Sequence, residues 1–204
     1  MPLHTRWSSD EIPAPARPSW QVLLGEQHGI VTYEQLRSYG HSAADVTANL
    51  RAGRWRRVLP RVYATFTGEL PRPARLHAAL RYGGHHAVLS HRTAAEEWGF
   101  LPIADHPVEI TVPYTSSAIS HKPSVVVHRS RALRYTTVGT TLPRTRTTDT
   151  ILDLAVAEQT GRQATMLIVD LVSRSSVSVA SMLDCFQLRP PFRFRSAIRR
   201  GLSW

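Results

Sequence analysis

The stretch GIVTYEQLRSYGHSAADVTANLRAGRWRRVLPRVYATF, residues 29–66, changes character halfway along its length. Its first half carries two helix starts, a capping box from Thr32 to Gln35 and a cap at Ser42, with glycines that can end each helix. After Gly53 the chain becomes rich in Trp, Val, Tyr and Phe around Pro60, a pattern typical of two short strands joined by a tight turn. The stretch therefore predicts two helices followed by a β-hairpin.

Another helix is predicted just before this stretch, from Trp20 to His28, with Ser19 as its cap. Because only two to three residues separate the next two helices, the order resembles a helix-turn-helix. Three helices and a hairpin predict a winged helix-turn-helix DNA-binding domain over residues 18–70. The preceding residues, 1–17, are rich in Pro, Ser and charge and are expected to form a flexible lead-in.

Helical and strand patterns alternate over residues 71–188, which predicts a second, mixed α+β domain. Its helices are expected at 75–82, within 90–100, from Asp149 through Ala155 and at 162–173, and its strands at 88–89, 108–112 and 125–128. The last segment, 189–204, is basic and poorly periodic and is expected to be a tail. The predicted fold class is α+β with an N-terminal winged helix-turn-helix.

Charge and composition limit the possible partners. The chain has 204 residues, a net charge of +10 and a pI near 10.9, which favours a polyanionic partner and nucleic acid ahead of a membrane surface. No apolar run approaches the roughly 18 residues of a membrane span. Since the N-terminus also lacks an apolar signal-peptide core, a cytoplasmic location is expected. The lone Cys185 is expected to be a buried apolar residue.

The third predicted helix offers a face for the major groove of DNA. Val46 and Leu50 lie on its predicted buried side, and the opposite side carries small residues and one arginine. Arginines around the hairpin are expected to grip backbone phosphates or enter the minor groove. The predicted DNA-binding residues are Ser42, Ala44, Thr47, Ala48, Arg51, Arg54, Arg56, Arg57 and Arg61. Because few of them can read base edges, DNA shape is expected to carry much of the specificity.

These residues resemble a known family. Residues 29–66 are similar to the N-terminal winged-helix domain of AbiEi-type antitoxins from type IV toxin–antitoxin systems. The matching residues are Gly29, Val31, Thr32, Gln35, Leu36, Gly40, Ser42, Leu50, Gly53, Trp55, Arg56, Arg57, Val58, Val62 and Tyr63. Arg61 departs from the pattern, because the family often has glycine there. The segments AVLSHRTAAEEWGF, VEITVPY, VVVHRSRAL and LPRTRTTDTILDLA resemble the middle region of actinobacterial relatives. Many relatives add a Vsr-like endonuclease domain, which this chain is expected to lack.

The resemblance implies a repressor that binds double-stranded operator DNA, expected to be an inverted repeat, and controls its own operon. It also implies a second domain that neutralises a nucleotidyltransferase-like toxin. Two alternatives stay open. The chain could be a nuclease-associated protein lacking its PD-(D/E)XK catalytic domain, or a winged-helix module that binds proteins.

The sequence predicts no catalytic site, metal site or cofactor. Asp149 is expected to cap a helix and Asp153 to be exposed, so neither pairs with a lysine as a PD-(D/E)XK nuclease requires. The histidines, including His91, lack zinc-motif spacing and are expected in turns or on the surface. A second interaction surface is predicted at Arg129, Arg131 and Arg134, the first two sharing one strand face.

Overall fold

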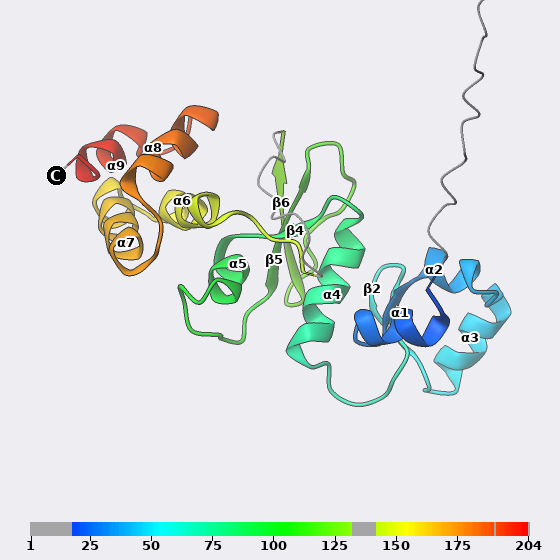
Figure 1. The fold of residues 1–204 in the computed structure, drawn as a ribbon. Coiled ribbons are helices and arrows are strands. Elements are labelled where there is room, and N and C mark those ends of the chain that lie inside the picture. The colour runs from blue at the N-terminus through cyan, green and yellow to red at the C-terminus, as the bar shows by residue number, and fades with distance from the viewer. Residues whose placement is uncertain (1–17, 132–141, 190, 204) are drawn as a thin grey trace, which may run out of the picture.

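The computed structural model describes residues 18–131, 142–189 and 191–203, so the predicted lead-in, 1–17, lies outside the described residues. The described chain is mixed α+β, which confirms the predicted fold class at that level. Its elements follow one another along an elongated molecule, with residues 18–66 at one end and 147–201 at the other (Figure 1). None of the described helices combines the length and the hydropathy that a bilayer-spanning segment needs.

The N-terminal unit contains three short helices and a small antiparallel sheet of order β1-β3-β2. Its elements are α1 (Trp20–Glu26), β1 (Ile30–Thr32), α2 (Tyr33–Ser38), α3 (Ala43–Arg51), β2 (Arg56–Leu59) and β3 (Val62–Ala64). The predicted helices and hairpin are confirmed, as is the Thr32–Gln35 capping box, with bonds of 2.9 and 3.2 Å. Strand β1 was not predicted, because three residues between two caps carry too little pattern.

The hairpin turn consists of Pro60 and Arg61, since Leu59 pairs with Val62. Arg61 adopts φ 60°, a left-handed conformation that normally favours glycine at this turn position. Contacts to α2 hold the arginine there. The Arg61 carbonyl accepts a 2.8 Å hydrogen bond from the Tyr33 amide, and its guanidinium pairs with Glu34 and lies over the Tyr33 ring.

Both faces of the β1-β3-β2 sheet are buried, against different parts of the chain. Val31 and Tyr63 pack with the helices of the N-terminal unit. Ile30, Val62 and Ala64 pack into a second core that includes helix α4 (Arg72–Gly83). A continuous hydrophobic core therefore crosses the predicted domain boundary at residue 70.

A second sheet, of order β4-β5-β6, forms the middle of the molecule. It comprises β4 (Val88–Leu89), β5 (Val108–Pro113) and β6 (Val125–Ser130), with helix α5 (His91–Glu97) after β4. Strands β4 and β5 are antiparallel, whereas β5 and β6 are parallel. Ile110 and Val112 pack against the end of α4, where an added Cβ on Gly83 would lie 2.8 Å from Ile110 Cδ1.

The C-terminal part is a helical layer. Its helices are α6 (Thr147–Ala157), α7 (Gly161–Arg174), α8 (Val179–Leu188) and α9 (Arg195–Gly201). The predicted basic tail contains helix α9, whose Ile198 and the following Leu202 are buried in the core of this layer. The helix spans only seven residues, too few for its apolar period to stand out among the arginines.

The predictions for Asp149 and Asp153 are wrong. Helix α6 begins before Asp149, whose side chain is fully buried, and Asp153 is also buried. Arg189 bridges them, with its Nη1 3.3 Å from Asp149 Oδ1 and its Nη2 2.6 Å from Asp153 Oδ1. Arg146 adds a third contact, from Nε to Asp149 Oδ2 at 3.1 Å. Cys185 is buried as predicted, and burial together with nearby Asp149 raises its thiol pKa to about 12.

Replacing Arg189 should destabilise the helical layer. Arg189→Leu leaves two buried carboxylates without their shared cation, so we expect the free energy of unfolding to fall by about 3 kcal/mol. The matched control is Arg174→Leu, which removes an exposed pair with Asp170 and should cost at most about 1 kcal/mol. Urea denaturation measures both, and equal losses would show that the buried bridge contributes nothing special.

Histidine 77 makes stability depend on pH. It is buried on α4, where its ring centroid lies 5.4 Å from that of His28. Burial, and then the charges of His28 and Arg81, lower its pKa from 6.5 to about 4. Below pH 6.5 the unfolded chain therefore binds a proton at His77 that the folded chain does not bind. The free energy of unfolding falls as the pH drops toward 4.

His77→Gln, which cannot titrate, should reduce the loss of unfolding free energy between pH 7 and pH 5 by about 2 kcal/mol relative to wild type. Urea denaturation at several pH values measures this difference. The exposed His85→Gln is the control and should keep the wild-type slope. An unchanged slope in the His77 variant would contradict the assignment.

Candidate nucleic-acid interface

One face of helix α3 is open to solvent. Ala44, Thr47, Ala48 and Arg51 are exposed, as predicted, while Val46 is buried on the opposite side. The helix lies at the outer end of the molecule, away from α4 (Figure 1). A long partner can therefore approach this face without meeting the other helices and strands of the described residues.

The hydroxyls of Ser42 and Thr47 already form hydrogen bonds with the backbone of this helix. Ser42 Oγ accepts a hydrogen bond of 3.1 Å from the Asp45 amide, and Thr47 Oγ1 donates one of 2.9 Å to the Ala43 carbonyl. Asp45 Oδ2 closes the capping box by accepting from the Ser42 amide at 2.7 Å. The face thus offers methyl groups and the Arg51 guanidinium, a surface suited to close approach more than to hydrogen-bonded base reading.

Asn49 ties the end of α3 to the hairpin. Its carbonyl accepts from the amides of Arg54 and Trp55, at 3.0 and 3.2 Å. Its side-chain Oδ1 accepts from Arg54 Nε at 2.8 Å, and its Nδ2 donates to the Asp45 carbonyl at 2.9 Å. Because all these groups are engaged, Asn49 acts as a positioning residue that fixes the hairpin and Arg54 relative to α3.

Two hairpin arginines are exposed, Arg57 on the strand β2 and Arg61 at the turn beside α2. Arg57 lies opposite Tyr63 on the sheet face that packs toward the helices, and its guanidinium carbon is 5.9 Å from the centre of the Tyr63 ring. Arg61 projects from the turn with a side chain 66% exposed. With Arg51 and Arg54, four of the five predicted arginines are exposed.

Arg56 is the exception. It lies opposite Ala64, on the sheet face covered by α4, and is only partly exposed. Its Nε and Nη2 are buried and have no hydrogen-bond partner among the described residues. Neighbouring strand residues point to opposite faces. Arg56 therefore does not share the exposed face of Arg57, and its DNA contact stays a prediction.

In the second predicted surface, at Arg129, Arg131 and Arg134, one arginine is engaged in hydrogen bonds within the chain. Arg129 donates to the carbonyls of Ser116, at 3.3 Å, and Ala118, at 2.7 Å, and so fastens the loop after β5. Arg131 lies over the exposed Tyr114 ring, 4.5 Å from its centre. Arg134 lies outside the described residues.

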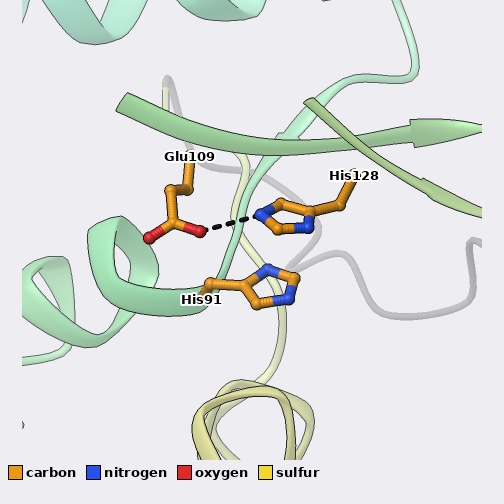
Figure 2. A group of neighbouring side chains, drawn as sticks. All are labelled: His91, Glu109 and His128. Atoms are coloured by element: carbon orange, nitrogen blue, oxygen red, sulfur yellow. Dashed lines mark hydrogen bonds and ion pairs between the residues drawn. The ribbon is translucent and has the colours of Figure 1, made fainter. Parts of the chain in front are cut away.

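The structure assembles one group of residues that the sequence did not bring together. His91, Glu109 and His128 come from α5, β5 and β6, and their donor atoms lie within 4.8 Å of one another (Figure 2). His91 and His128 are therefore not isolated surface groups. The alternation in VEITVPY places Glu109 on the opposite strand face from the apolar Ile110, but only the parallel pairing of β5 and β6 shows which histidine it meets.

Comparison with known proteins supports the fold. No protein-family model and no curated protein sequence matches the chain. It resembles a crystal structure of the RV2827C protein from Mycobacterium tuberculosis, with 18% sequence identity and a TM-score of 0.52, over 89% of this chain and 73% of that one. At this identity, the chain and the mycobacterial protein are similar in fold.

Proposed function

We propose that residues 18–70 form a winged helix-turn-helix that binds double-stranded DNA. The order of helix, strand, two helices and hairpin supports this reading, with α3 as the recognition helix and β2–β3 as the wing. The observation that carries the proposal is the exposed small-residue face of α3, followed in the same unit by four exposed arginines, of which Arg54 is held against the end of α3 by Asn49. Small residues let the helix lie deep in the major groove while the guanidinium groups neutralise phosphates on its rims.

The biological role that fits this interface best is repression of the chain's own operon. The resemblance of residues 29–66 to AbiEi-type antitoxins supports this role, as does the net charge of +10. By the same resemblance, the partner of the remaining chain is a nucleotidyltransferase-like toxin. An adjacent reading frame that encodes such an enzyme would support the antitoxin role.

Binding to the upstream DNA should exceed binding to random duplex, and both should weaken as salt increases. Each phosphate contact releases a condensed counterion, so four contacts give a slope of log K against log salt near −3.6, from about −0.9 for each contact. Fluorescence anisotropy over a salt series measures the slope and the ratio of affinities. Equal affinity for both DNAs would mean that the upstream DNA contains no specific operator. No measurable binding to either DNA would favour a protein-binding module.

The exposed arginines should carry the salt dependence. Arg54→Ala combined with Arg57→Ala should reduce the slope by about 2 and weaken binding by on the order of 50-fold near 0.1 M salt, on every sequence. The matched control is Arg199→Ala with Arg200→Ala on α9, which removes the same charge from exposed positions at the far end of the molecule. Equal losses in both variants would mean that net charge alone drives binding.

The face of α3 can be tested separately. Ala48→Glu places a carboxylate where the helix would meet the groove, so affinity should fall at least tenfold while the fold is kept, because the site is exposed and Glu favours helices. Ala180→Glu makes the same change at an exposed position of α8 and should bind like wild type. If the Ala48 variant binds DNA as tightly as its control, α3 does not enter the groove.

A further inference from the structure

The cluster formed by His91, Glu109 and His128 opens into a pocket of about 620 Å³ between the second sheet and the helical layer. Arg129, Arg131 and Arg189 also line this pocket. It lies outside the candidate nucleic-acid interface, and the proposed DNA binding does not use it.

The fold places the three side chains together from separate segments. In the parallel pair, Glu109 lies opposite Val126 and Thr111 opposite His128, so Glu109 and His128 share one face of the sheet. His91 starts α5 on that same face (Figure 2). Two bonds hold α5 to Glu109: the Ser90 amide donates to the Glu109 carbonyl at 3.0 Å, and the Glu109 amide donates to Thr93 Oγ1 at 2.9 Å.

The distances are close to those of a metal site. His128 Nε2 lies 2.8 Å from Glu109 Oε2, and the rings of His91 and His128 stack with centroids 3.6 Å apart. All three donor atoms lie within 4.8 Å of one another. A tetrahedral ion with bonds of about 2.0–2.1 Å separates its ligands by about 3.3 Å. Binding one ion therefore requires the side chains to move closer and the two stacked rings, whose planes are 16° apart, to turn until both nitrogen lone pairs face the ion.

The chemistry of the three groups also fits. Two imidazoles and one carboxylate are the protein ligands of many zinc sites that keep a fourth position open. The Oγ of fully buried Ser90 lies 3.0 Å from His91 Nδ1 and so holds the His91 ring in place.

We propose that His91, Glu109 and His128 bind one Zn²⁺ ion, with the fourth coordination position facing the pocket. Arg189 does not oppose the ion strongly, because Asp149 and Asp153 already pair with it.

The test uses the full chain after removal of metals with EDTA. Isothermal titration with Zn²⁺ and elemental analysis after gel filtration should give one ion per chain, and saturating zinc should raise the melting temperature. Glu109→Gln and His128→Ala should each weaken binding roughly 100-fold or more. Glu109→Gln keeps a hydrogen-bonding oxygen for His128 and is the deciding variant if His128→Ala does not fold.

The matched control is His85→Ala with His86→Ala, which removes two adjacent exposed histidines and should leave the stoichiometry at one. Three results would overturn the proposal. They are no zinc binding by the wild type, binding unchanged in Glu109→Gln, and binding lost only in the His85 and His86 double variant. The first would mean that the three side chains form a hydrogen-bonded stack with a structural role.

Discussion

Burial of the small β1-β3-β2 sheet on both faces determines what the N-terminal unit can present to a partner. Tyr63 packs toward the helices, whereas Ile30 and Ala64 pack toward α4. Because strand residues alternate between faces, this arrangement leaves Arg57 exposed and encloses Arg56. The sheet packs on α4 from behind, and the hydrogen bonds of Asn49 join the base of the hairpin to the end of α3. A surface fixed before binding requires less ordering when a partner arrives.

The sequence was most informative where structure depends on neighbours along the chain. The caps at Thr32 and Ser42 and the turn at Pro60 act over three or four residues, and each was predicted from the sequence. The exposed face of α3 followed from helical periodicity alone. Arg56 and Arg57 could not be told apart in the same way, because their difference depends on a helix that begins at Arg72. Local pattern places a side chain on a face, but it does not show what covers that face.

The remaining corrections share one physical cause, which is contact between residues far apart in sequence. The sequence predicted a helix cap at Asp149 and an exposed acid at Asp153. In the structure Arg189, which follows α7 and α8 in the sequence, bridges the two carboxylates. The grouping of Glu109 with His128 depends on the parallel pairing of β5 and β6. Buried charges and converging ligands are therefore the features of this chain that its sequence conceals most. Both occur where the second sheet meets the helical layer.

We propose that α3 and the arginines after it touch duplex DNA. Chemical modification of arginines with phenylglyoxal, read by mass spectrometry with and without a duplex at low salt, tests this contact residue by residue. With the duplex present, we expect the reaction with phenylglyoxal to slow at Arg51, Arg54, Arg57 and Arg61. Arg199 and Arg200 should react as they do without DNA. Protection confined to α9, or equal protection at both ends of the molecule, would contradict this proposal.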